Sequence, residues 1–248
     1  MAWVPPMNRE ERLKARFVPP AWQRWYHVAL ERRRGERELH LVPLLADPAR
    51  IAIDAGANRG VWTEVLRRQA RRVCAFEPNP KMYAELRRCA RPEVATYPFA
   101  LSDRAGTAEL LVPQNDRGFS NQGASLSAAR IGGGRCGRVQ VQTRRLDDLD
   151  LGAVGFIKID VEGHELAVLD GARETLRRDR PTLVVEIEER YHDRPIVDLL
   201  AAVCAFGYHA LCLHRGRLRM AASLDLDACH SRPASRADYV FNWIFLPD

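Results

Sequence analysis

Short apolar runs alternate with amphipathic stretches from residue 50 onward. This alternation is typical of strand–helix–strand units and predicts a mainly parallel sheet. We predict strands at residues 50–55, 72–77, 94–101, 155–161, 182–188, 208–214 and 239–246. The amphipathic stretches in the crossovers predict helices near residues 60–69, 80–90, 164–178 and 194–206. The pattern therefore indicates an α/β fold, a mostly parallel seven-stranded sheet with helices on both faces.

Two regions depart from this simple alternation. Residues 107–112 and 139–143 look like an added antiparallel ribbon around a glycine- and serine-rich loop at 114–138. A long loop inside a compact domain is usually functional or disordered. The last apolar run, 239–246, follows a stretch without a convincing helix, so we expect it to pair antiparallel with 208–214. Such an edge differs from the all-parallel sheet of a dinucleotide-binding fold.

The segment before residue 50 is basic and punctuated by prolines. We predict an N-terminal helical extension at 1–49, attached to a domain at 50–248. Its aromatic residues are expected to form a helix face packed on the main body rather than a membrane-interface anchor; they are Phe17, Trp22, Trp25 and Tyr26. No apolar run approaches the roughly 18 residues that cross a bilayer, and the first residues lack a secretory signal. A cytoplasmic location without stable membrane insertion is therefore expected.

The formal net charge is +6, which would suit an anionic partner such as nucleic acid. Of the 38 basic residues, only Lys14, Lys81 and Lys158 are lysines, and the other 35 are arginines. This arginine bias extends over the whole chain and favours a solvated basic surface over a nucleic-acid footprint. We therefore expect no nucleic-acid partner.

A glycine turn from Gly56 to Gly60 follows the first predicted strand and precedes a helix. Glycines let the backbone turn tightly and approach a ligand, and a helix N-terminus presents unpaired N–H groups. The fingerprint of dinucleotide binding is G-x-G-x-x-G, and its second glycine is missing here, where Asn58 stands. The turn therefore suits the aminocarboxylate half of S-adenosylmethionine better than a pyrophosphate.

Acidic and polar residues end the next two predicted strands. Glu77 lies about 20 residues beyond the glycine turn, where an acidic group accepts hydrogen bonds from ribose hydroxyls. A surface glutamate would be the plain alternative, but the spacing and the prolines that stop the strand favour the ribose role. Ser102 and Asp103 end the third strand and are placed to border the adenine, although Asp103 can also simply begin a turn.

Several sequence motifs occur in the order found in one enzyme family. They are IDAGANRGVWT (53–63), FEPNP (76–80), ALSDRAGTAEL (100–110), NQGASL (121–126), FIKIDVEGHE (156–165) and TLVVEIE (182–188). Over residues 51 to about 190 the chain resembles the FkbM family of methyltransferases. The resemblance implies a class I, Rossmann-like fold that uses S-adenosylmethionine, usually to O-methylate a hydroxyl of a sugar, glycan or secondary metabolite.

The resemblance and the strand-end positions together define the expected binding sites. The cofactor is expected to contact Asp54, Gly56, Asn58, Gly60, Thr63, Glu77, Pro78, Asn79, Ser102, Asp103 and Asp160. The substrate is expected to contact Asn121, Ser125 and Glu162, with the 114–138 loop closing over donor and acceptor.

Charged residues in and after the predicted central strand are the candidate catalytic groups. Lys158, Asp160 and Glu162 alternate, so their side chains would share one face, and charges buried there must pair or serve chemistry. Methyl transfer needs aligned reactants and removal of the acceptor's proton. Asp160 is a candidate base or donor-orienting group, Glu162 and Glu186 would hold substrate hydroxyls, and Lys158 would lower the acceptor's pKa or take its proton. His164, near a helix N-terminus, is a further candidate base.

Other functions compete with small-molecule O-methylation. A nucleic-acid-modifying methyltransferase has only the net charge in its favour, because no N-P-P-Y or D-P-P-Y segment follows the fourth strand. A nicotinamide-dependent oxidoreductase lacks its glycine fingerprint, and a non-catalytic protein would not need acidic residues at two strand ends. Carboxylates could also hold Mg²⁺, but a metal is not the favoured interpretation. A homodimer is compatible with the sequence.

Overall fold

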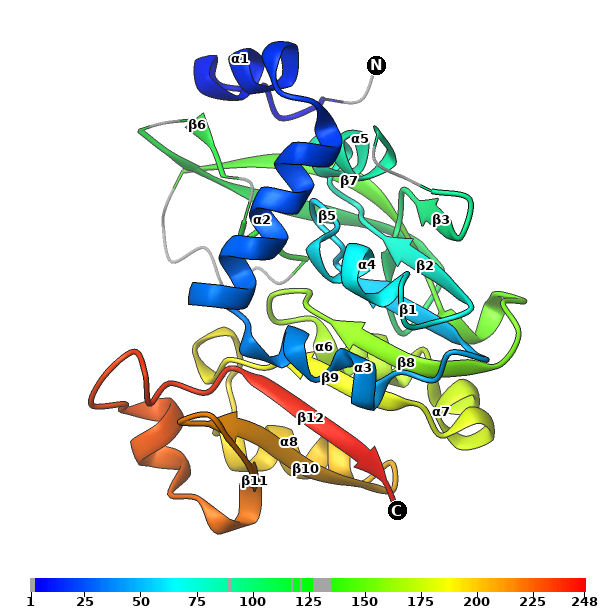
Figure 1. Cartoon of the computed structure of the whole chain (residues 1–248), viewed down its shortest axis with the longest axis vertical. Coiled ribbons are helices and arrows are strands. Elements are labelled where there is room, and N and C mark those ends of the chain that lie inside the picture. The colour runs from blue at the N-terminus through cyan, green and yellow to red at the C-terminus, as the bar shows by residue number, and fades with distance from the viewer. Residues whose placement is uncertain (1–2, 89–90, 117, 121, 127–134) are drawn as a thin grey trace.

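The computed structural model describes residues 3–88, 91–116, 118–120, 122–126 and 135–248. Its main sheet has the strand order β11-β10-β12-β9-β8-β1-β2-β3 (Figure 1). These strands are β1 (Ile51–Ala55), β2 (Arg72–Phe76), β3 (Val94–Tyr97), β8 (Val154–Ile159), β9 (Thr182–Glu186), β10 (Tyr208–His214), β11 (Arg217–Met220) and β12 (Asn242–Pro247). The mostly parallel sheet is confirmed, as is the antiparallel pairing of β12 with β10. Within the described ranges the sheet has eight strands, one more than the sequence pattern predicts, because β11 was missed.

A second, smaller sheet is inserted between β3 and β8. It has the order β4-β7-β5-β6, formed by β4 (Ala100–Leu101), β5 (Gly106–Asn115), β6 (Gly118–Phe119) and β7 (Cys136–Arg144). The antiparallel ribbon expected from the sequence is confirmed as β5 and β7, with Gly106 opposite Thr143. The single strand expected at 94–101 is wrong. It divides at Pro98, which has no N–H to donate, and its second half, β4, pairs with β7 instead of continuing along β2.

Helices cover both faces of the main sheet (Figure 1). The crossover helices are α4 (Val61–Leu66), α5 (Pro80–Arg88), α6 (Glu165–Asp170), α7 (Arg173–Asp179) and α8 (Ile196–Cys204). The one helix expected at 164–178 is two helices, separated at Gly171, where a Cβ atom would lie 1.9 Å from the Ser102 carbonyl oxygen. Short helical turns are η3 (Leu146–Asp148), η4 (Glu189–Tyr191), η5 (Ala221–Ser223) and η6 (Asp227–Ser231). The expected helix end at 89–90 lies outside the described residues.

Helices α1 (Arg9–Phe17), α2 (Pro20–Arg34), η1 (Arg37–His40) and α3 (Val42–Leu45) precede the first strand. An Asn8–Glu11 capping box starts α1, since each side chain accepts a hydrogen bond from the other residue's backbone N–H. Helix α1 lies at one end of the molecule, and α2 leads from it toward the main sheet (Figure 1). None of the helices in the described ranges is both long and apolar enough to cross a membrane.

Alternate residues of the central strands pack into two layers. On one face Ile53, Ile157 and Val185 belong to a core that includes residues of α6, α7 and α8. On the other face the alternating neighbours pack with Leu39 of η1 and Val42 of α3. The segment before β1 therefore supplies part of the domain core, and its η1–α3 end is fixed to the sheet by apolar burial.

The aromatic residues of α1 and α2 do not pack on the main body, so that expectation was wrong. Phe17, Trp22, Trp25 and Tyr26 are 70%, 72%, 70% and 58% exposed. Helix α2 contacts the body through its opposite side instead, where the buried Arg24 donates from Nη2 to the Leu86 carbonyl oxygen at 3.0 Å. The aromatic side consequently faces solvent.

Candidate active site

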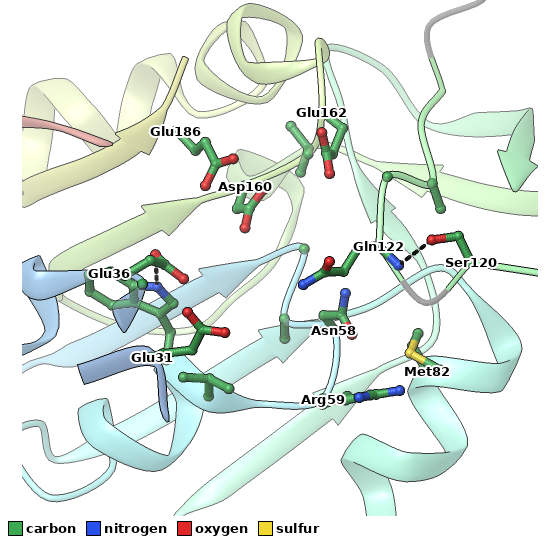
Figure 2. A pocket seen from close by; sticks show the side chains of 18 of the residues that line it. Glu31, Glu36, Asn58, Arg59, Met82, Ser120, Gln122, Asp160, Glu162 and Glu186 are labelled. Atoms are coloured by element: carbon green, nitrogen blue, oxygen red, sulfur yellow. Dashed lines mark hydrogen bonds between the residues drawn. The ribbon is translucent and has the colours of Figure 1, made fainter. Parts of the chain in front are cut away.

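A cavity of about 1870 Å³ lies at the carboxyl ends of β1, β2, β8 and β9. Parallel strands end at one edge of a sheet, and open α/β sheets bind their ligands there. Helices α1, α2 and α5, the segment after β6 and residues 236–241 contribute further walls. Figure 2 shows carboxyl groups from the sheet and from the N-terminal segment around one space.

The turn after β1 is fixed by its glycine. The backbone N–H groups of Gly56 and Ala57 donate to the Phe76 carbonyl oxygen at 2.9 and 3.0 Å, which ties the turn to the end of β2. Gly56 has a φ of 80°, and a Cβ atom there would lie 1.8 Å from the Asp160 carbonyl oxygen. Only glycine therefore allows the turn to lie against the segment that follows β8.

Glu77 connects the turns that follow β1 and β2. Its two carboxylate oxygens accept hydrogen bonds from the backbone N–H groups of Asn58 and Asn79, both at 2.7 Å. Burial raises the pKa of Glu77 to about 7, although these two hydrogen bonds oppose the shift. Because each carboxylate oxygen has two acceptor sites, the group can still accept hydrogen bonds from a ligand in the cavity that it lines.

Asp54 lies beside this turn at the end of β1 and is almost fully buried. Its carboxylate accepts a hydrogen bond from the Thr63 hydroxyl of α4. Burial raises the pKa of Asp54 to about 6, with the Thr63 hydrogen bond and Lys158 acting in the opposite direction. Thr63 does not line the cavity, so its contact in the structure is with Asp54.

Lys158 is fully buried in β8, and its ammonium group contacts residues from three distant segments. Its Nζ atom lies 3.0 Å from Asn242 Oδ1, 3.9 Å from Glu36 Oε2 and 5.2 Å from the centroid of the Trp62 ring. Burial alone would lower the pKa of Lys158, but Asp160 and other nearby carboxylates outweigh it and raise the pKa. Lys158 is therefore held as a cation.

Glu36, from the segment before β1, completes this cluster. Its carboxylate accepts hydrogen bonds from Trp62 Nε1 at 2.6 Å and from Asn242 Nδ2 at 3.1 Å. Asn242 in turn pairs in register with Glu186 across β12 and β9. An N-terminal carboxylate, a buried lysine and the antiparallel strand therefore meet at the cavity wall.

Asp160 and Glu186 form the most perturbed carboxyl pair of the site. Burial raises the pKa of Asp160, and Glu162 adds to the rise while Lys158 opposes it. Burial also raises the pKa of Glu186, reinforced by Asp160. Carboxyl groups whose pKa values are raised by burial are typical of sites that exchange protons with a substrate.

Glu162 lines the cavity because of a turn after β8, and not because it continues the alternation of side chains along the strand. Strand β8 ends at Ile159, and Glu162 has a left-handed backbone with a φ of 55°. The expectation that Glu162 continues the face of Lys158 along an extended strand to residue 161 is therefore wrong. A turn places its side chain beside the cavity together with Asp160, as Figure 2 shows.

His164 is the N-cap residue of helix α6 and lines the cavity. Its Nε2 atom lies 2.9 Å from Ser102 Oγ, and that hydroxyl also donates to Asp103 Oδ1 at 2.9 Å. Burial lowers the pKa of His164, opposed by Glu165 and Asp103. The neutral imidazole is favoured, which a base would need.

The structure brings most of the predicted site residues to one cavity wall. The lining includes Asp54, Gly56, Asn58, Glu77, Pro78, Asn79, Lys158, Asp160, Glu162, His164 and Glu186. The predicted residues that do not line the cavity are Gly60, Thr63, Ser102, Asp103 and Ser125. Ser125 donates its hydroxyl to the Glu162 carbonyl oxygen, so it contacts the turn that presents Glu162. Asn121 lies outside the described residues, as does part of the 114–138 loop.

Sequence reasoning missed the contributions of the N-terminal segment. Glu31 and Glu36 line the cavity, and so does His27 of α2. Nothing in the motifs indicates them, since they precede the first strand and have no fixed spacing from it. Within the described ranges, no group of three or more histidine, cysteine, aspartate or glutamate side chains is arranged to hold a metal ion.

Comparisons with known proteins relate this site to one enzyme family. The profile of the methyltransferase FkbM domain matches residues 54–210. The chain is 29% identical to the 2-O-methyltransferase NoeI of Sinorhizobium fredii, across 64% of this chain and 74% of that protein. It is 30% identical to the methyltransferase sdnD of Sordaria araneosa, across 60% of this chain and 70% of that protein.

A solved structure has the same fold. The FkbM methyltransferase from Methylobacillus flagellatus superposes with a TM-score of 0.51 at 17% sequence identity. The match covers 80% of this chain but only 44% of that larger protein. At this identity the likeness concerns the fold alone.

Proposed function

The chain belongs to the family of FkbM methyltransferases, which use S-adenosylmethionine, and we propose that it methylates a hydroxyl group of a small molecule. A sugar, a glycan or a secondary metabolite is the proposed acceptor class. The observation that carries the proposal is the cavity wall, where several carboxylates and one buried ammonium group face a common space. Hydroxyl groups donate hydrogen bonds to carboxylates, so a polyhydroxylated acceptor suits this wall. The 2-O-methyltransferase activity named for one relative supports the same class.

The cavity residues at β1 and β2 fit the donor. The glycine turn at Gly56 leaves room for the aminocarboxylate end, with Asp54 and Asn58 beside it. Glu77 retains acceptor sites for ribose hydroxyls, and Asn79 lines the cavity beside it, where we place the adenine end. When bound, the donor supplies an electrophilic methyl group on a sulfonium. Gly60, Thr63, Ser102 and Asp103 do not line the cavity and in this proposal support the residues that do.

The acceptor's proton goes to a carboxylate of the Asp160–Glu186 pair. The pKa values of both carboxyl groups are raised, which makes their carboxylates stronger bases for the acceptor's proton. The acceptor oxygen forms the new C–O bond as the methyl group's bond to sulfur breaks, and the proton stays on the carboxylate. Lys158 stabilises the negative charge that develops on the acceptor oxygen, and His164 is the second candidate base.

Three other features of the protein remain proposals. The reaction needs no Mg²⁺, since the base and the ammonium group supply the required charges. Nucleic acid is disfavoured as an acceptor, because acidic side chains outnumber basic ones along the cavity wall. A cytoplasmic location and a homodimer stay predictions from the sequence.

Labelled methyl transfer from S-adenosylmethionine to a panel of sugars, glycans, amines and RNA tests the proposed function. We expect label in hydroxyl compounds only, confirmed as a methyl ether by mass spectrometry. Asp160→Asn should lower that turnover at least ~10²-fold, because the amide cannot take the proton. The control Asp193→Asn changes an exposed aspartate away from the cavity and should have no effect. Label found only in amines or RNA would refute O-methylation.

A further inference from the structure

Helices α1 and α2 expose an unusual group of large apolar side chains. Leu13, Phe17, Trp22, Trp25 and Tyr26 are between 50% and 72% exposed, and together we call them the aromatic face. Scattered exposed apolar residues are normal, but large ones grouped on one side of a helix mark a contact surface. Three of the five carry a polar atom on an aromatic ring, a residue type enriched where water meets lipid.

The spacing of these residues shows that each helix presents one side to solvent. Trp22, Trp25 and Tyr26 are three and four positions apart, and Arg33 continues the same side of α2. Leu13 and Phe17 are four positions apart on α1. The opposite side of α2 is already used, because His27 and Glu31 line the catalytic cavity there. The aromatic face is therefore not the side through which α2 packs against the body of this chain.

Positive charge is concentrated around the aromatic face. The first 34 residues contain eight lysines and arginines against three glutamates, so they carry +5 of the chain's net +6. The exposed members beside the aromatic residues are Arg9, Arg12, Arg16 and Arg33. This charge distribution argues against a second copy of the chain as occupant. A symmetric contact would place each cationic face against its twin.

We propose that the aromatic face docks the protein on an anionic lipid surface. Helices that combine Trp, Phe and Leu with Lys and Arg lie in the membrane interface, with apolar side chains below the headgroups and basic ones against them. Each basic residue near an anionic surface adds about fivefold in binding, and the apolar side chains add the rest. Docking through the outer side of α2 holds the catalytic cavity, on its inner side, next to the lipid surface.

Sedimentation of the full chain with vesicles of neutral phosphatidylcholine, with or without about one third phosphatidylglycerol, tests this proposal. We expect at least about tenfold stronger partitioning to the anionic vesicles, reduced by raised salt. Trp22→Ser combined with Trp25→Ser should lower partitioning at least about tenfold. Arg12→Gln combined with Arg16→Gln should lower binding to anionic vesicles and leave the weak binding to neutral ones unchanged. These side chains are exposed and do not line the cavity, so the variants are expected to fold.

Matched controls lie on strand β11, which exposes the same residue types. Leu218 and Met220 are 48% and 44% exposed, and Arg217 and Arg219 are exposed beside them. Changing the first pair to serine, or the second to glutamine, should leave partitioning unchanged. Equal binding to both vesicle types, equal losses in the β11 controls, or no vesicle binding would overturn the proposal. So would preferential binding of single-stranded RNA, or a dimer in solution that the Trp variants abolish.

Discussion

Replacement of Glu77 by glutamine separates its structural role from its proposed contact with the cofactor ribose. The carboxylate accepts one hydrogen bond from Asn58 N and one from Asn79 N. A glutamine keeps one acceptor oxygen, so one buried N–H loses its partner. The free energy of unfolding should fall by about 1 to 3 kcal/mol, the cost of an unsatisfied buried donor.

The same substitution should weaken binding of S-adenosylhomocysteine by about 1.5 to 3 kcal/mol, the scale of hydrogen bonds to a charged group. That range corresponds to roughly a 12- to 150-fold increase in Kd. Isothermal titration calorimetry measures it directly. Glu109→Gln, which changes a solvent-facing glutamate paired with Arg138 on the smaller sheet, is the control and should leave the Kd unchanged.

A ligand variant makes the test specific for the ribose. The 2′-deoxy analogue of S-adenosylhomocysteine lacks one donor, so wild-type protein should bind it at least about tenfold more weakly than the parent compound. The Glu77→Gln protein should bind the analogue and the parent compound with nearly equal affinity, since the acceptor for that hydroxyl is already weakened. If both proteins lose the same factor with the analogue, Glu77 only joins the two turns and the ribose assignment is refuted.

Three further predictions follow from the charges around the cavity. Lys158→Arg should keep S-adenosylhomocysteine binding but lower turnover at least ~10²-fold, because the larger guanidinium, fully buried at this position, must displace Asn242 or Trp62. Turnover near the wild-type rate would show that Lys158 is only a structural counter-ion. Glu36→Gln should raise the acceptor's KM about tenfold without changing cofactor affinity. A changed Kd for S-adenosylhomocysteine with an unchanged KM would show that Glu36 contacts the donor instead. Burial raises the pKa of Glu77 to about 7, above its unfolded value near 4.5, so the stability tied to its protonated form is lost as pH rises through 7. Urea unfolding should therefore show wild-type stability falling by roughly 3 kcal/mol between pH 5 and 8, with a flatter profile in Glu77→Gln; parallel profiles would contradict the shift.

The parallel core of the fold follows from local sequence patterns. Strands β1, β2, β8 and β9 are buried apolar runs bounded by turn residues, which can be identified without knowing their neighbours. The glycine turn and Glu77 were also predictable, because the distance from a βα turn to the end of the next parallel strand is nearly constant. These features depend on residues close together in the chain.

Features that depend on distant residues required the tertiary structure. The hydrogen bond from Asn242 to Glu36 joins positions 206 residues apart, and no local pattern marks either residue. Strand β4 leaves the main sheet because Pro98 interrupts the pairing and β7 offers another edge. The aromatic residues of α1 and α2 have a spacing that fits either packing or exposure. Local periodicity determines which residues share a side of an element, whereas the side that faces protein, cavity or solvent is decided by the free energy of the whole packed chain.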